Sequence, residues 1–211
     1  MKKCFKMKIV LIILSLLVSF SFEIAAQVVV KGDDCAIKGK EFYYFLQTDA
    51  NDSASYQISI VGGHFDSSNI HMLSISKSTL IKVTWDSIGV GLIKVLSNSD
   101  TVLKLIFVAE NLDPGYVLDN DIQQTIQKDK TTYLFHCSEA KGAHCDPVFT
   151  YQWQQSFDGV VWTNIQNGQG QDLLFDTRAV NSTIYLRRNA LEVKSKTFGT
   201  SNIAMLIRIT E

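Results

Sequence analysis

Two His-Cys dipeptides, His136-Cys137 and His144-Cys145, bring together side chains of the types that bind metals. Zinc takes imidazole and thiolate ligands in tetrahedral sites, so these four groups could hold one ion. Adjacent residues of a strand point to opposite faces, however, which opposes ligation by both members of one dipeptide. In an oxidising compartment the two thiols would instead close a short loop. The sequence favours a Cys137–Cys145 disulfide, with metal binding by the four residues as an alternative.

Two other groups of polar residues have side chains of types that could do chemistry. His64 and His71 flank a polar loop that contains Asp66, and a histidine with an aspartate can orient a nucleophile, but no Gly-x-Ser-x-Gly elbow accompanies them. Asp33 and Asp34 could offer oxygen ligands to calcium, but their spacing fits no calcium-loop motif. No motif assigns a nucleophile or a general base, so we expect no enzymatic activity, no cofactor and no resident metal.

Aromatic residues in the last third of the chain could bind a ligand. Trp162, Tyr151 and Tyr185 could stack on the apolar face of a sugar, provided that they are exposed together in one patch. The alternative is cross-strand packing, which the spacing favours. Trp153 is expected to be a core residue, because it alternates with polar glutamines along one strand. Arg187-Arg188 is expected to place one guanidinium on an aromatic ring and the other in water.

The first 26 residues are typical of a cleaved signal peptide. Four lysines precede an uncharged apolar run at residues 9–22, which ends near Ala25 and Ala26. The run is shorter than the ~20 residues that span a bilayer, and no later segment reaches that length. We therefore expect an exported protein that is secreted, held at the cell surface or periplasmic, with no membrane span after cleavage. Cys35 would then be left without an obvious partner.

The formal charge argues against one class of partner. The whole chain carries −1, and residues 1–26 hold four lysines and one glutamate, so the mature part carries −4. A chain without a basic surface lacks the electrostatic attraction on which nucleic-acid binding depends. We expect a protein or a glycan as the partner and no nucleic acid.

The pattern of apolar residues predicts an all-β fold. Runs of β-branched and aromatic residues are bounded by Gly, Asn, Asp and Ser, as strands are. Ile81, Val83 and Trp85, for example, share one face of a strand and are expected to be buried. In the first half the predicted strands are residues 27–30, 41–47, 54–61, 80–85, 91–97 and 101–109. In the second half they are residues 116–118, 131–136, 149–155, 160–165, 172–175, 183–190 and 202–210.

Turn residues divide the chain into two predicted β-sandwich domains. The segment Asn111-Leu-Asp-Pro-Gly115 carries dense turn chemistry, which places a boundary within residues 110–118. We assign residues 27–112 to the first domain and 113–211 to the second. Asp158-Gly159 indicates a hairpin with a type I′ turn. Residues 121–130 are polar almost throughout and are expected to form a loop or a short edge strand.

The second half resembles the immunoglobulin-like modules of exported proteins from Bacteroidetes-type bacteria. The matching residues are Tyr151-Gln-Trp-Gln-Gln-Ser-Phe-Asp-Gly159, Trp162-Thr-Asn-Ile165, Thr183-Ile-Tyr-Leu-Arg-Arg188 and Ser201-Asn202. They follow a YQWQxSxDGxxWxxI hairpin, a TxYxRR strand and a closing SN. The sequence departs from this pattern at residues 137–145, where such modules have a Gly-rich turn.

The first half resembles the PKD-like modules of the same proteins. The matching residues are Gly32, Cys35, Gly39, Tyr56-Gln-Ile-Ser-Ile-Val-Gly-Gly63, Ile81-Lys-Val-Thr-Trp85 and residues 89–95. Such modules often pair a cysteine at the position of Cys35 with one after the penultimate strands, and this half has no such second cysteine. The two resemblances imply a structural or adhesive module of the cell surface or the secreted fraction. Carbohydrate binding and metal binding at His136, Cys137, His144 and Cys145 are the alternatives.

Overall fold

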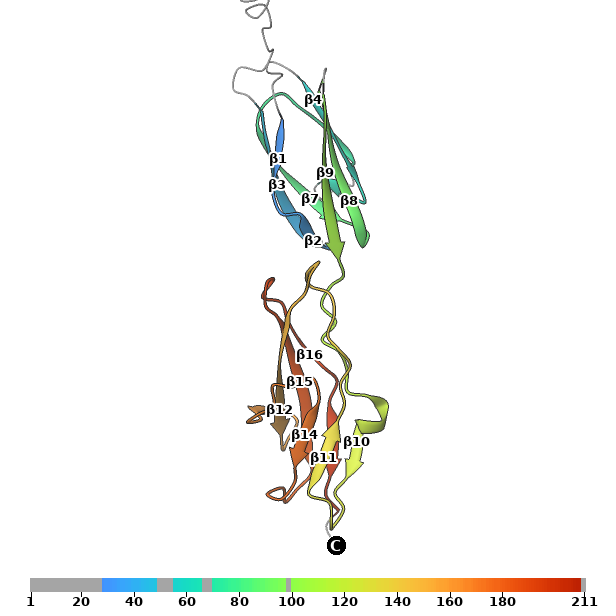
Figure 1. Ribbon diagram of the computed structural model, residues 1–211, viewed down its shortest axis with the longest axis vertical. Helices are drawn as coiled ribbons and strands as arrows, with labels where there is room; N and C mark the ends of the chain where they lie inside the picture. Colours follow the sequence, from blue (N-terminus) through green and yellow to red (C-terminus); the bar gives the residue numbers. More distant parts are fainter. Residues whose placement is uncertain (1–27, 49–54, 66–69, 98–99, 210–211) are drawn as a thin grey trace, which may run out of the picture.

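The computed structural model describes residues 28–48, 55–65, 70–97 and 100–209. In these residues the regular structure is β, apart from a single-turn 3-10 helix, η2, at Asp119–Asp121. The predicted all-β fold is therefore confirmed. The chain forms two halves that lie end to end, each with its own sheets and its own buried core (Figure 1). The predicted signal peptide, and Asp66 of the histidine loop, lie outside the described residues.

The N-terminal half contains a four-stranded and a five-stranded sheet. The first has the order β1, β3, β7, β5, with the bounds Val29–Lys31, Glu41–Gln47, Thr79–Trp85 and Gly63–Phe65. The second has the order β2, β9, β8, β4, β6, with the bounds Cys35–Ile37, Thr101–Ala109, Gly89–Leu96, Tyr56–Val61 and Met72–Ile75. Neighbouring strands are antiparallel, except that β2 and β9 are parallel.

Trp85 lies at the centre of the N-terminal core. It is fully buried together with Ile81 and Val83, which confirms the predicted face of β7. Its indole Nε1 donates a hydrogen bond of 3.2 Å to the Tyr44 hydroxyl, and burial raises the pKa of that hydroxyl to about 12. The indole ring also contacts the facing sheet at Gly91, where an added Cβ would lie 2.2 Å from it. The two sheets therefore pack against each other through this tryptophan.

The C-terminal half contains a six-stranded and a two-stranded sheet. The larger has the order β10, β17, β15, β12, β13, with the bounds Gln123–Thr125, Ala204–Ile207, Ile184–Glu192, Phe149–Ser156 and Thr163–Asn164. Its sixth strand, β16 (Phe198–Thr200), pairs with β15. The smaller sheet joins β11 (Thr132–Phe135) to β14 (Leu173–Asp176). Trp153 of β12 is fully buried in the core, as predicted.

Arg188 of β15 lies in the C-terminal interior and is also fully buried. Its guanidinium donates to the backbone carbonyls of Gln171, Pro114 and Ser138 over 3.0, 2.7 and 2.7 Å. It also lies over the Tyr151 ring, 4.2 Å from the centroid. A buried cation is tolerated only when other contacts replace its water. The carbonyls accept from the two terminal nitrogens, whereas Nε is buried without a hydrogen-bond partner. The predicted stacking of one arginine on an aromatic ring is confirmed. The prediction that the other remains in water is wrong, because Arg187 is half-buried and lies over the Trp162 ring.

The predicted hairpin at Asp158-Gly159 is partly wrong. Strand β12 ends at Ser156 and β13 comprises only Thr163–Asn164, so the connection is longer than two residues. A type I′ turn needs positive φ at both central residues, but only Gly159 has it. The Asp158 carboxylate instead accepts the amides of Val160 and Val161, each over 2.8 Å. These hydrogen bonds hold the segment as a loop where a strand was predicted.

Candidate functional site at the junction of the two halves

The connection between the halves is paired along its length. Residues 110–118 run antiparallel to residues 136–143, and Asp113 and Lys141 exchange two backbone hydrogen bonds of 2.9 and 2.8 Å. Further backbone hydrogen bonds extend the pairing on both sides of this pair. The C-terminal half therefore begins directly after β9, within the predicted boundary segment, and residues 110–118 do not form a free linker.

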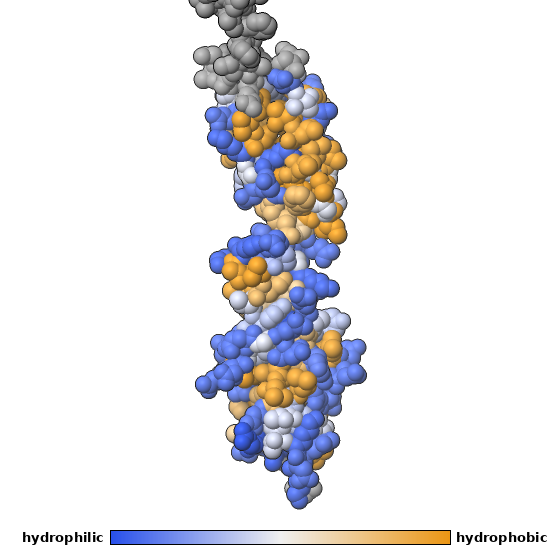
Figure 2. All heavy atoms as spheres, in the orientation of Figure 1, coloured by the Kyte–Doolittle hydropathy of each residue, from blue (hydrophilic) through white to orange (hydrophobic). Residues whose placement is uncertain are grey.

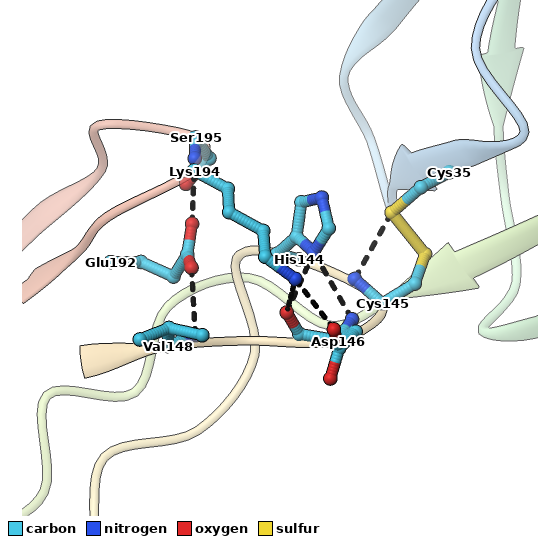
Figure 3. A network of polar contacts seen from close by, with 8 residues as sticks. All are labelled: Cys35, His144, Cys145, Asp146, Val148, Glu192, Lys194 and Ser195. Carbon is cyan, nitrogen blue, oxygen red and sulfur yellow. Dashed lines mark hydrogen bonds and ion pairs between the residues drawn. A yellow bond between two sulfur atoms is a disulfide. The ribbon is translucent and has the colours of Figure 1, made fainter.

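A disulfide joins the two halves beside this connection. Gly142 and Ala143 have φ of 76° and 61°, and the chain that follows turns toward β2. The sulfur of Cys145 is bonded to that of Cys35, with 5.8 Å between the two Cα atoms and 110 residues between them in sequence. Cys35 lies beside Phe107 in the parallel pair of β2 and β9. The bridge thus attaches a loop of the C-terminal half to the edge of the N-terminal five-stranded sheet (Figure 3).

The predicted Cys137–Cys145 disulfide is wrong. Cys137 pairs with Val117 in an isolated bridge, and its side chain is buried in the C-terminal core. Burial raises the pKa of its thiol to about 11, so the nucleophilic thiolate is strongly disfavoured. Cys145 lies in a loop that faces the other half. The short spacing of Cys137 and Cys145 in sequence is compatible with a disulfide between them. The local backbone, however, turns the two side chains to different surroundings.

An ion pair lies next to the disulfide, as Figure 3 shows. Lys194, from the turn after β15, donates to the backbone carbonyl of Asp146 over 2.6 Å and also pairs with its carboxylate. The hydrogen bond and the charge of Lys194 hold the pKa of the Asp146 carboxyl below its ordinary value. The amide of Asp146 donates to Nδ1 of His144 over 3.1 Å. These contacts fix the loop that carries Cys145 against the turn after β15.

A buried carboxylate organises that turn. Glu192, at the end of β15, is fully buried and accepts the amides of Val148 and Ser195 over 2.9 and 2.6 Å. Desolvation acts to raise the pKa of this carboxyl, but the hydrogen bonds outweigh it and lower the pKa to about 2. The ionised carboxylate therefore holds both chain segments beside the junction.

Two grooves of about 650 and 460 Å³ lie against the disulfide, and Phe107 and His144 line both. The remaining walls of the larger groove are mostly apolar side chains and backbone, including Val108, Ala109 and Pro147. In the described residues, Nδ1 of His144 contacts the backbone carbonyl and amide of Asp146, over 3.0 and 3.1 Å. The junction therefore offers two grooves and a covalent tie between the halves.

The aromatic residues predicted to bind a ligand do not form one patch. Trp162 and Tyr151 lie at opposite faces of the six-stranded sheet, because Trp162 is covered by Arg187 and Tyr151 by Arg188, two consecutive residues of β15. The Arg187 guanidinium lies 4.0 Å from the centre of the Trp162 ring and covers one face of it. Tyr185 is on the Trp162 side and is half-buried. Packing against arginine explains these rings better than sugar stacking.

The residues of the alternative metal site are separated. His136 Nδ1 lies 2.7 Å from the Asp121 carboxylate, Cys137 is in the core and Cys145 is in the disulfide. No group of three or more His, Cys, Asp or Glu in the described residues is arranged to hold a metal ion. Of the two histidines in the first half, His64 contacts Asp86 and His71 contacts the Gly63 carbonyl. Within the described residues, no helix is long and apolar enough to cross a membrane.

Comparisons with known proteins find one family model and a set of solved structures that match the chain. A family described as a domain of unknown function, DUF8696, matches residues 120–209. Among solved structures, domains 5-6 of the S-layer protein SbsC are 13% identical with a TM-score of 0.31, over 87% of this chain and 98% of that one. Domains 4-9 of the surface layer protein SbsC are 14% identical with a TM-score of 0.27, over 87% and 31%. No curated protein matches the sequence. Similarity this low does not establish a shared function.

Proposed function

We propose that this protein is an exported, non-enzymatic structural module that acts as a short rigid spacer outside the cytoplasm. Its two β-sandwich domains, residues 27–112 and 113–211, hold a binding partner at a fixed distance from the surface or matrix that carries the module. The partner is a protein or a glycan at the cell surface. The observation that carries the proposal is the disulfide between Cys35 and Cys145, which ties one half to the other.

The disulfide supports export. Structural disulfides form and persist in secreted, periplasmic and surface proteins, whereas the cytosol keeps thiols reduced. The apolar leader at residues 9–22, with four lysines before it, is an independent argument for the same compartment. The two observations come from separate parts of the chain, and both favour a protein that functions outside the cytoplasm.

The tie between the halves supports a rigid spacer. Interfaces between domains of one chain commonly allow relative motion unless they are large and apolar. Here the backbone connection is itself paired with residues 136–143, and the disulfide adds a second, covalent attachment. Two attachments restrain bending far more than one. The ion pair of Lys194 with Asp146 then fixes the loop that carries the bridge.

The experiment begins with fractionation of cells that produce the complete chain. Intact mass, measured with and without reductant, would give the start of the mature protein and its thiol state. We expect a product that lacks residues 1–26 and lies outside the cytoplasm, with a tryptic cross-link that joins the peptides of Cys35 and Cys145. A full-length, fully reduced protein in the cytoplasm would overturn the proposal.

The spacer role is tested separately by small-angle X-ray scattering. The wild type is compared with the variant Cys35→Ser/Cys145→Ser, and Cys137→Ser serves as the control that keeps the bridge. We expect one narrow range of maximum dimension for the wild type and the control, and a broader range for the double variant. Equally broad distributions in all three proteins would show that the halves move freely, which would refute rigidity.

A further inference from the structure

The outer face of the five-stranded N-terminal sheet is unusually apolar. Along β9, Ile106 and Val108 point into the core, and the alternate residues Leu103, Leu105 and Phe107 point outward and are between 55% and 58% exposed. A strand with one face in the core normally carries polar residues on the other. Figure 2 shows hydrophobic residues gathered over the region where β8 and β9 lie in Figure 1. Strand β9 thus has two apolar faces, and only one of them is covered.

The exposed residues form one continuous surface, because their strands are neighbours. Phe107 is the cross-strand partner of Val90, and Leu105 is the partner of Leu92, which in turn pairs with Val61. We call this surface the outer β9 face. Its members that are more than half exposed are Val61, Met72, Val90, Leu103, Leu105 and Phe107. In the described part of the chain, Lys94 is the charged residue of this face, and it lies between Leu103 and Ser59.

We propose that a second copy of this chain covers the outer β9 face, so that the protein is a dimer with two five-stranded sheets packed face to face. The exposed area of the outer β9 face supports a dimer. The six residues expose about 600 Å², which is at the upper end of the usual range for the largest apolar patch on a monomeric protein. With Leu92, Leu96 and the polar rim added, the face approaches the roughly 800 Å² that each partner contributes to a standard stable interface.

The shape and charge of the face also suit a second copy. Sheets pack face to face about 10 Å apart, with side chains that interdigitate, and a twofold axis lets one face fill both sides of the contact. The side chain of Lys94 can extend its amine to the rim of such an interface while its methylene groups remain covered. The face therefore needs no partner with an acidic patch. The C-terminal half does not block it, since Phe107, at the end nearest the junction, is still 55% exposed.

Sedimentation velocity of the mature, oxidised protein from about 1 to 500 µM tests the proposal. The variant Leu105→Lys places a charge in the middle of the face. Leu174→Lys is the matched control, because Leu174 is an exposed leucine of β14 in the other half. We expect wild type and Leu174→Lys to dimerise alike. We expect Leu105→Lys to dimerise about 100-fold more weakly or not at all, since two introduced like charges oppose each other across the interface.

Two results would overturn the proposal. The first is a wild type that remains monomeric at the highest concentration, which would show that a second copy does not cover the face. The second is a wild type and a Leu105→Lys variant that dimerise equally, which would place the contact on another surface. Far-UV circular dichroism of each variant confirms that the sheets are retained. The expected spectrum is that of the wild type, because the Leu105 side chain is exposed in the monomer.

Discussion

Removal of the Cys35–Cys145 disulfide is expected to lower the free energy of unfolding by about 4 to 5 kcal/mol. A cross-link stabilises the folded state mainly by restricting the unfolded chain, and the effect grows with the length of the closed loop. The cysteines are 110 residues apart, and a loop of about 100 residues corresponds to about 4.7 kcal/mol. For a domain of 60–100 residues, this loss lowers the melting temperature by roughly 20 °C or more.

The two halves need not unfold together, and the magnitude is similar if they do not. When only the N-terminal half unfolds, residues 35–109 remain closed between the disulfide and the folded C-terminal half. A loop of roughly 75 residues corresponds to about 4.5 kcal/mol. A bridge between Cys137 and Cys145 would close only nine residues and contribute about 2.6 kcal/mol. The size of the effect therefore distinguishes the observed pairing from the one favoured by the sequence.

The assay is urea denaturation followed by tryptophan fluorescence, with and without reductant. The wild type is compared with Cys35→Ala/Cys145→Ala and with Cys137→Ala. Reductant should lower the stability of the wild type and of Cys137→Ala, and it should leave the double variant unchanged. Mass spectrometry verifies the thiol state of each sample. A difference below about 1 kcal/mol between verified oxidised and reduced wild type would refute the loop-closure argument.

Three further predictions concern single buried groups. Arg188→Met leaves three part-buried carbonyls without their donor, so we expect at least about 3 kcal/mol of destabilisation in urea denaturation, and a loss below 1 kcal/mol would contradict this. The folded-state pKa of Glu192, about 2, lies below its ordinary value of 4.5, so its contribution is complete above pH 4.5 and is lost as the pH falls toward 2. Melting temperatures between pH 2 and pH 6 should show this decline, and Glu192→Gln should flatten it. Burial raises the pKa of the Cys137 thiol to about 11, so iodoacetamide at pH 8 should alkylate it only after unfolding, and rapid alkylation of the folded protein would be inconsistent with its burial.

Side-chain alternation made the longer strands predictable. The predicted bounds of residues 41–47 and 101–109 agree with β3 and β9, because each strand places alternate apolar residues in a core. The short strand β2 was missed. It has three residues and is held by parallel pairing with β9, which starts more than 60 residues later. No local pattern in residues 35–37 records that partner, so short strands of this kind depend on tertiary context.

The junction was only partly predictable, for a related reason. Dense turn chemistry at Asn111-Leu-Asp-Pro-Gly115 lies directly after the end of β9 at Ala109. The disulfide partner was predicted wrongly, because the spacing of two cysteines says nothing about which way each side chain points. Cys137 lies in a paired segment with its thiol in the core, and Cys145 follows two residues of positive φ that redirect the chain. Arg188 was missed as an interior residue because its three carbonyl partners come from distant loops.

The disulfide and the outer β9 face meet at one residue, and this links the two proposals. Phe107 is the neighbour of Cys35 in β2 and also the junction end of the outer β9 face. The bridge fixes the loop with Cys145 beside this residue, so it sets how closely the C-terminal half approaches the face. Without the bridge, the halves would be joined only by the chain between Ala109 and Glu110, and bending there would bring the C-terminal half over Phe107. The disulfide that makes the proposed spacer rigid therefore also holds the C-terminal half away from the outer β9 face, which leaves this face exposed to a second copy.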